Sequence, residues 1–367
     1  ALQESCDPWA WRSSKAVLAS PQFTPGESSS APLPWTGDLQ QLLVDRLAVA
    51  PTSAASLALA DQLLAQPPSE SLRQQADSLR VDLVGERVTY VVNRNLNFTN
   101  HCLQHCSFCA FRRDPGADGA YWHSFDTLQE RAAEAARLGA TELCIQGGLN
   151  PEARLQGSAL RYYQALLEAL QQAAPGMHLH AFSPQELLFM AQQDQVPLQA
   201  VIDGLMASGL GSIPGTAAEV LDEAVRARLC PEKLTAREWC AVVLQVHRSG
   251  LRSTATLMAG HLETSRQLAG HLLTLVALQQ VAWQHQQAGF SEFVLLPFIG
   301  AQAPAPLRQR VGRDQPDHTD MLALTAQARL LLLTAFAREN IERIAIPELR
   351  ELVGREVDRR LARAVGV

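Results

Sequence analysis

A regular alternation of short β-like runs with longer helical segments, beginning near residue 86, most constrains the fold of this chain of 367 residues. The β-like runs lie at 88–92, 143–146, 178–182, 211–214, 253–258, 293–297 and 341–346. The helical segments between them lie at 127–138, 158–173, 184–192, 197–208, 235–249, 265–287 and 318–338. Such an alternation predicts parallel strands that are joined by crossover helices.

These repeated strand-and-helix units predict an α/β protein, built as a full or partial (β/α) TIM-type barrel over residues 86–346. Leucines at helical spacing predict an N-terminal helical extension over 38–85. The Ser-, Pro- and Gly-rich residues 1–37 are expected to form a flexible arm, and a charged helix is expected over 347–367. Because active sites of such barrels lie at the C-terminal ends of the strands, we expect the functional residues there.

Charge and hydropathy argue against two broad classes of function. The 37 acidic residues outnumber the 31 basic ones, which leaves a formal net charge of −6. The chain therefore lacks the basic character expected of a nucleic-acid-binding protein. Its longest apolar blocks, such as 330–333, are far shorter than the roughly 20 residues of a membrane helix. We expect neither a nucleic acid nor a membrane as a partner.

Three of the seven cysteines, Cys102, Cys106 and Cys109, lie together in the loop after the first predicted strand. An odd and clustered set does not suit a disulfide framework, and it indicates metal binding in a reducing, cytoplasmic compartment. Three thiolates can hold three corners of a cubic iron–sulfur cluster, whereas electron-transfer clusters use four. The fourth iron would then be open to a substrate. A zinc site completed by His101 or His105 is the alternative, although C-x3-C spacing is less usual for zinc.

The wider sequence around these cysteines resembles a known family. The pattern C-x3-C-x-aromatic-C, with Phe108 as the aromatic residue, is similar to the signature of radical S-adenosylmethionine (radical SAM) enzymes. The form Ile-Pro-Gly-Thr-Ala-Ala-Glu at 213–219 is most similar to the second subunit of FO synthase, and the resemblance covers about residues 70–335. Further segments that resemble the FO synthase group and its menaquinone-pathway relatives lie at 88–100, 146–148, 180–184, 212–219 and 260–264.

The resemblance implies a barrel of the radical SAM type. It implies that Cys102, Cys106 and Cys109 hold a [4Fe-4S] cluster whose open iron binds S-adenosyl-L-methionine. The implied enzyme is a transferase that cleaves L-tyrosine and couples its 4-hydroxybenzyl group to 5-amino-6-(D-ribitylamino)uracil, in the synthesis of the deazaflavin FO. A functional link to the first FO synthase subunit, and an electron donor such as flavodoxin or ferredoxin, follow from the same resemblance.

Several residues at predicted strand ends acquire candidate roles from this resemblance. The candidates for cofactor binding are Gln146, Gly147, Gly148, Ser183, Glu219 and Arg226. The candidates for substrate binding are His180, His261 and Glu263. Each candidate also has an ordinary structural alternative. Gly147 and Gly148 would form a tight turn, and His180 would be a core residue. Glu219 would be a first-turn helix carboxylate, Arg226 a solvated helix arginine, and His261 with Glu263 a loop pair that caps a helix.

The C-terminal sequence departs from the family pattern. Residues 338–367 lack the Ser-Trp-Val-Lys-like strand and the Asn-Asp-Leu-Gly-Gly-Thr segment that are typical of the family, so we expect an open or differently closed barrel. Two alternatives therefore stay open. One is a menaquinone-pathway enzyme of the dehypoxanthine futalosine cyclase or aminofutalosine synthase type, and the other is a catalytically impaired paralogue that still binds the cluster.

Overall fold

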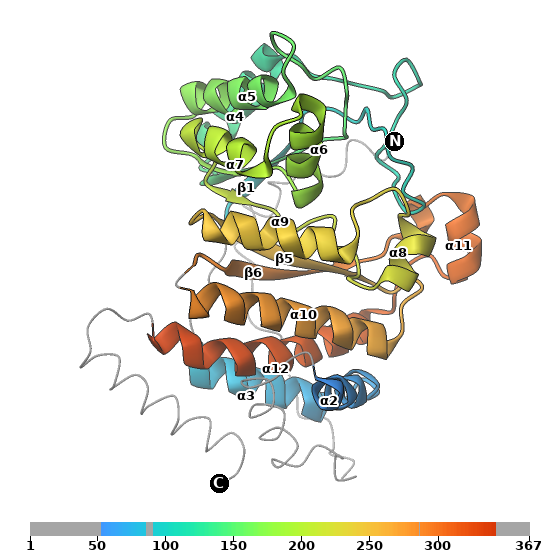
Figure 1. Ribbon diagram of the computed structural model, residues 1–367. Helices are drawn as coiled ribbons and strands as arrows, with labels where there is room; N and C mark the ends of the chain where they lie inside the picture. Colours follow the sequence, from blue (N-terminus) through green and yellow to red (C-terminus); the bar gives the residue numbers. More distant parts are fainter. Residues whose placement is uncertain (1–52, 86–90, 286, 343–367) are drawn as a thin grey trace. The chain divides into compact units, whose positions relative to one another are not determined.

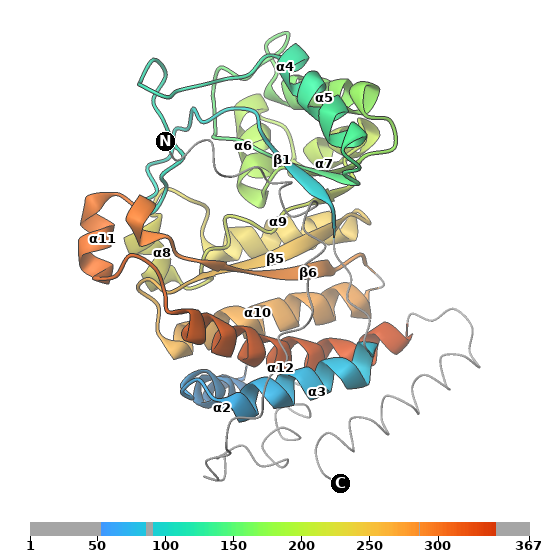
Figure 2. The same cartoon turned by 180° about the vertical axis from the view of Figure 1, so that it is seen from behind.

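The computed structural model describes residues 53–85, 91–285 and 287–342, which form a curved, six-stranded parallel sheet with helices around it (Figure 1). The strands follow one another in the sheet in chain order, so that β1 and β6 are its two edges (Figure 2). This half-barrel confirms the predicted α/β class with a partial barrel. The strands are β1 (Asn93–Asn97), β2 (Glu142–Gln146), β3 (His178–Ala181), β4 (Ser212–Ile213), β5 (Arg252–Ala259) and β6 (Phe290–Pro297).

Helices connect successive strands, and several begin at the residues that the sequence indicates. Ser183 and Glu186 form a capping box at the start of α6, and Thr235 and Glu238 form a second one at the start of α9. Each box satisfies backbone N–H groups that have no partner within the helix. The crossover helices are α4 (Phe125–Arg137), α5 (Ala159–Ala173), α6 (Pro184–Asp194), α7 (Leu198–Ala207), α8 (Glu223–Leu229), α9 (Ala236–Arg248) and α10 (Ser265–Gln284).

The two faces of the sheet differ in polarity. In β2, Leu143 and Ile145 are almost fully buried, whereas Glu142, Cys144 and Gln146 alternate with them and are only partly buried. Because side chains alternate along a strand, the second set shares the opposite face. The polar residues of β2 therefore lie on the face of the sheet that carries the cavities described below.

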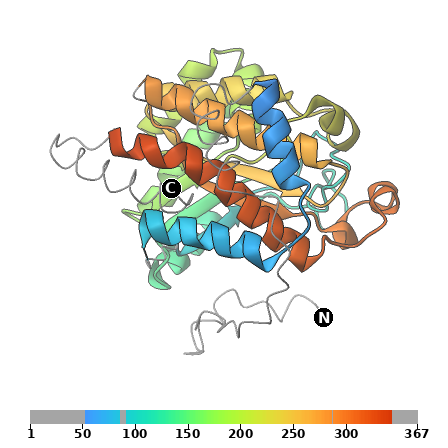
Figure 3. The same cartoon turned by 90° about the horizontal axis from the view of Figure 1, so that it is seen from below.

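Four helices pack together beyond β5 and β6. Helix α12 (His318–Glu342) packs between α3 (Glu70–Val84) and α10, and α2 (Ala54–Leu64) packs against α10 and α12 (Figure 3). Buried apolar side chains from each helix, Leu63, Leu79, Leu272 and Leu331 among them, form this part of the core. A short 3-10 helix (Gly300–Gln302) and α11 (Ala305–Val311) precede α12.

Two predicted strands differ from the structure. The run 88–92 was expected to form the first strand, but β1 begins at Asn93, where pairing with β2 starts, and residues 88–90 lie outside the described residues. The run 341–346 was expected to form a strand, but residues 341 and 342 are the end of α12, and 343–346 lie outside the described residues. Helices α8 and α11 were not predicted, because each has only seven residues.

The predicted arm at 1–37 and the predicted C-terminal helix at 347–367 also lie outside the described residues. Within the part of the chain that the structure describes, no helix combines the length and the apolar character that crossing a membrane requires.

Replacing Leu179 by Ala tests the core beneath the sheet. Leu179 lies in β3 and is almost fully buried, so we expect Leu179→Ala to lower the free energy of unfolding by about 2–5 kcal/mol through lost burial and a cavity. Leu322→Ala, on the exposed side of α12, is the matched control and should change it far less. Chemical denaturation followed by circular dichroism measures both, and equal losses would contradict the assignment of Leu179 to the core.

Candidate active site

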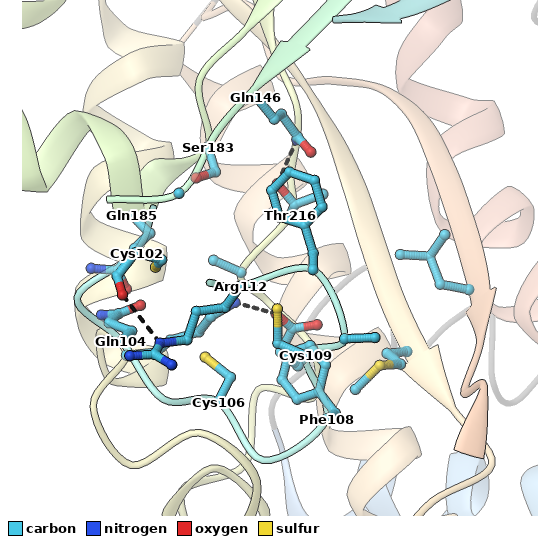
Figure 4. Close-up of a pocket in the computed structure, with 18 of the residues that line it drawn as sticks. Cys102, Gln104, Cys106, Phe108, Cys109, Arg112, Gln146, Ser183, Gln185 and Thr216 are labelled. Carbon is cyan, nitrogen blue, oxygen red and sulfur yellow. Dashed lines mark hydrogen bonds and ion pairs between the residues drawn. The ribbon is translucent and has the colours of Figure 1, made fainter. Parts of the chain in front are cut away.

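A cavity of about 570 Å³ lies at the carboxyl ends of the strands (Figure 4). Asn97 and Gln146, the last residues of β1 and β2, line it, as do Met258 and Pro297 near the ends of β5 and β6. Parallel strands bring their carboxyl ends to one edge of the sheet, which is where barrel enzymes place their active sites. The cavity therefore lies at the end of the sheet where the strand-and-helix pattern predicts the functional residues.

The three clustered cysteines, Cys102, Cys106 and Cys109, come from one loop after β1, and all three line this cavity (Figure 4). They are partly buried and free of disulfide bonds. The loop carries few regular hydrogen bonds of its own, and contacts with other elements hold it instead. Ser107 donates through its N–H and its hydroxyl to the carbonyl of Leu229, at 3.0 and 2.7 Å.

Two glycines at the end of β2 allow the cysteine loop to approach the strand. A Cβ atom on Gly148 would overlap the carbonyl oxygen of His101 and would lie 2.9 Å from the Cβ of Cys102. A Cβ on Gly147 would overlap the ring of Phe98, which packs edge-on against other aromatic rings. Only glycine avoids these overlaps, because any other residue carries the Cβ.

Glu186 ties the end of β2 to the end of β3. Its carboxylate accepts hydrogen bonds from the N–H of Gly147 at 3.0 Å and from the N–H and hydroxyl of Ser183, both at 2.7 Å. Burial raises the pKa of Glu186 to about 7, and these hydrogen bonds oppose that rise because they favour the ionised form. Glu186 thereby holds Gly147 and Ser183, two predicted cofactor-binding residues, beside the cavity.

A buried ion pair also lines the cavity. The ammonium of Lys233 lies 2.6 Å from a carboxylate oxygen of Glu219, both side chains are at most 15% exposed, and both line the cavity. Burial alone would lower the pKa of Lys233, but the Glu219 carboxylate and the nearby Cys106 raise it above its ordinary value. Lys233 also lies 5.3 Å from the ring centroid of Phe108. It is thus a positive charge placed beside the cysteine loop.

Lys233 was not among the residues predicted from the sequence. It is one of only two lysines in the chain, and it follows a Cys-Pro-Glu run directly before the capping box at Thr235. A lysine in a chain whose other basic residues are almost all arginine is the signal that could have identified it.

Arg226 lies behind the cavity wall and is not among the residues that line the cavity. Its buried guanidinium donates to the carbonyl oxygens of Ala217 at 3.2 Å and Ala218 at 2.6 Å, and it also bonds the carbonyl of Leu234. These carbonyls flank Glu219 and Lys233 in the sequence, so Arg226 supports the two loops that carry the ion pair.

His261 and Glu263 lie in the loop after β5 and also do not line the large cavity. They contact each other at 2.9 Å, and Glu263 accepts a hydrogen bond from the N–H of His261 at 2.8 Å. Although burial raises the pKa of Glu263, the bond to His261 and the backbone bonds dominate and lower it to about 2. His180 lies away from both groups, in a smaller cavity at the amino ends of the strands.

The structure therefore brings most of the predicted cofactor-binding residues to one cavity and leaves the others outside it. The predicted residues that line it are Cys102, Cys106, Cys109, Gln146, Gly147, Gly148, Ser183 and Glu219. Those placed elsewhere are His180, Arg226, His261 and Glu263.

A parallel half-barrel with a three-cysteine loop after its first strand is an arrangement that one superfamily shares. The Radical SAM superfamily model matches residues 96–275, and the chain belongs to that superfamily. It is 52% identical over 263 residues to a protein of Nostoc punctiforme, with 71% of this chain and 69% of the relative covered. A relative from Synechococcus elongatus is 53% identical over 275 residues, with 74% and 71% covered.

Both relatives are 5-amino-6-(D-ribitylamino)uracil–L-tyrosine 4-hydroxyphenyl transferases, and within the superfamily the chain belongs to this family. Solved structures show the same fold at low sequence identity. Methylornithine synthase (PylB) has a TM-score of 0.57 at 14% identity, over 85% of this chain and 83% of that one. The hydrogenase maturase HydG from Carboxydothermus hydrogenoformans has a TM-score of 0.56 at 16% identity, over 80% and 64%.

Gly148→Ala tests the close approach of the cysteine loop. The added methyl group overlaps the backbone at His101 and presses on Cys102, so the loop must move away from β2. We expect a lower iron content after anaerobic reconstitution, measured by iron and sulfide analysis. Gly270→Ala is the matched control, because its Cβ would meet nothing within 4 Å. It should leave the iron content unchanged, and full iron loading of Gly148→Ala would contradict the expectation.

Lys233→Gln tests the buried ion pair. The change leaves the Glu219 carboxylate without its cationic partner, and we expect a loss of about 3–5 kcal/mol in unfolding free energy. The double variant Lys233→Gln, Glu219→Gln removes the buried charge as well and should recover part of that loss. Arg228→Gln, exposed on α8, is the control for loss of one positive charge. Equal effects of Lys233→Gln and Arg228→Gln in chemical denaturation would argue against the pair.

Proposed function

We propose that this chain is a radical SAM transferase that cleaves L-tyrosine and couples its 4-hydroxybenzyl group to 5-amino-6-(D-ribitylamino)uracil. The observation that carries the proposal is the identity of 52–53% to the transferases of this family, together with a three-cysteine cavity at the carboxyl ends of the strands. The substrates are those that the names of the relatives state.

The cavity suits an iron–sulfur cluster. Cys102, Cys106 and Cys109 would hold it, because all three line one cavity and none is engaged in a disulfide. Gly148 supports this assignment, since the space that a Cβ would fill is taken by the cysteine loop itself. When bound there, the [4Fe-4S] cluster and S-adenosyl-L-methionine would supply the radical that starts the reaction.

The polar wall next to the cysteines is the proposed binding site for S-adenosyl-L-methionine. Gln146, Gly147 and Gly148 would offer backbone groups at the end of β2, and Glu186 holds Gly147 in place. Ser183 and Glu219 would contribute polar side chains from the ends of β3 and β4. Arg226 would act through these residues, because its guanidinium binds the carbonyls beside Glu219 rather than facing the cavity.

The remaining wall is suited to an aromatic and a polar substrate. Phe111 and Phe298 provide apolar surface, while Asn95 and Gln302 provide amide groups that can donate and accept hydrogen bonds. A volume of about 570 Å³ lies within the usual range of roughly 300–1,000 Å³ for small-molecule sites. The walls would orient L-tyrosine and the uracil and would exclude water.

We propose that His261 and Glu263, which were predicted to bind substrate, support the substrate site indirectly. Their contact at 2.9 Å, and the bond from the His261 ring to the carbonyl of Met258 at 3.0 Å, would position the end of β5. Met258 itself lines the cavity. A direct substrate contact is not proposed for His180, which lies at the other end of the sheet.

Two partners of the reaction are part of the proposal. A flavodoxin or ferredoxin would deliver the electron, and the first FO synthase subunit would use the product. Both rest on the resemblance of the sequence to the second subunit of FO synthase.

An anaerobic assay with reconstituted protein tests the function. With reductant, S-adenosyl-L-methionine, L-tyrosine and the ribitylaminouracil, we expect 5′-deoxyadenosine and the coupled product, measured by liquid chromatography and mass spectrometry. Deoxyadenosine formed only with a futalosine derivative would favour a menaquinone-pathway enzyme. No deoxyadenosine with any of these substrates would favour an impaired paralogue.

Matched cysteine variants separate cluster binding from folding. Cys106→Ala is expected to abolish product formation and the brown colour of the reconstituted protein. Only two of the three thiolates that would hold the cluster remain in this variant. Cys240→Ala, on helix α9 away from the loop, is expected to keep both. Retention of the cluster in Cys106→Ala would overturn the assignment of the ligands.

A further inference from the structure

A second cavity, of about 220 Å³, lies at the amino ends of the strands. Glu142 and His178, the first residues of β2 and β3, line it together with His180, Ser212 and Glu292. The cysteine cavity lies at the other end of the same strands, and Gln146, which lines it, is four residues beyond Glu142. At ~3.3 Å per strand residue, these two positions are separated by roughly 13 Å along β2.

The strand register brings two histidines and a carboxylate together in this second cavity. Glu142 pairs with His178 across the β2–β3 ladder, and His180 follows two residues later on the same face of β3. One ligand atom from each of the three side chains lies within 4.8 Å of the other two. The His178 Nε2 and Glu142 Oε2 atoms are 4.0 Å apart. These separations need only small side-chain movements to close around one ion.

The hydroxyl of Ser212 lies 2.7 Å from Nε2 of His178 and 2.7 Å from Nδ1 of His180. A hydroxyl has one hydrogen to donate, so it can donate to one ring only and must accept from the other. Both ring nitrogens therefore converge on one point at the floor of the cavity. An ion that binds these two ring nitrogens beside the Glu142 carboxylate would take the place of their hydrogen bonds to Ser212.

The electrostatic surroundings also suit a cation. Glu292 adds a second carboxylate to the lining, and Arg252 adds one positive charge. The carboxylates thus outnumber the cationic side chain in the cavity. The side chain of His178 is 45% exposed, which gives an ion a path from solvent, while His180 is buried at the floor.

We propose that Glu142, His178 and His180 bind a divalent transition-metal ion of the zinc type at the amino end of the half-barrel, separate from the cysteine site. Two imidazoles and one carboxylate form a donor set that suits zinc and leaves one position for water. The ion would link β2 to β3 and would stabilise the folded chain, since a ligand that binds only the folded state shifts the unfolding equilibrium.

The test uses the full chain with its cluster reconstituted, incubated with zinc chloride and desalted. We expect about one zinc per chain beyond the cluster iron, measured by plasma mass spectrometry. The zinc K-edge X-ray absorption spectrum should show nitrogen and oxygen neighbours with the outer-shell pattern of imidazole. Thermal unfolding should shift to a higher temperature when zinc is added. Because zinc absorption is read at its own edge, cluster iron does not interfere.

Ligand variants assign the site. Glu142→Gln keeps the side-chain shape, and His178→Ala changes a partly exposed residue, so both should fold. We expect each to weaken zinc binding on the order of 10-fold or more, since outer-shell changes alone cost 10–100-fold, and to leave the iron content unchanged. His285→Ala, an exposed histidine after α10, is the matched control and should keep full zinc binding.

Three outcomes would overturn the proposal. The first is no zinc above background in the unaltered protein, which would leave Glu142, His178 and His180 as a hydrogen-bonded network around Ser212. The second is sulfur ligation in the absorption spectrum, which would place the zinc at the cysteines. The third is equal zinc binding by His178→Ala, Glu142→Gln and the unaltered protein.

Discussion

The pairing of β2 with β1 and β3 determines where both candidate sites lie. In this register Glu142, Cys144 and Gln146 share one face of the sheet, while Leu143 and Ile145 are buried on the other. Strand direction then separates the two ends, with the cysteine cavity at the carboxyl end and the histidine-carboxylate cavity at the amino end. A shift of one residue would exchange the two faces, so neither cavity would keep its lining.

Buried acidic and basic side chains hold the loops around the cysteine cavity. Glu186 joins the ends of β2 and β3 through Gly147 and Ser183, and the contact of Glu219 with Lys233 joins two further loops. A buried charge that loses its partner is costly, so these contacts restrict the loops to one arrangement. Strand ends cannot achieve this through apolar packing alone, because their backbone groups need hydrogen-bond partners.

Much of the described fold could be predicted from local patterns. The predicted strands at 143–146, 178–182, 211–214, 253–258 and 293–297 all overlap observed strands. The apolar side chains of β2 to β5 are mostly buried, whereas Val294 and Leu296 of the edge strand β6 are 37% and 36% exposed. The first strand was predicted too early, since β1 reads Asn-Arg-Asn-Leu-Asn and pairing with β2, rather than hydrophobicity, decides where it begins. Its polar residues Asn95 and Asn97 face the cavity, which removes the apolar signal of a strand.

The sequence by itself determined the cysteine spacing, the glycine pair after β2 and the capping residue Ser183, because each depends on neighbours along the chain. Only the tertiary structure decided which of two basic residues seven positions apart, Arg226 and Lys233, lines the cysteine cavity. Arg226 is surrounded by backbone carbonyls and supports the wall, while Lys233 meets Glu219 at the cavity. The partners of a long basic side chain come from other elements, so its role depends on how those elements pack.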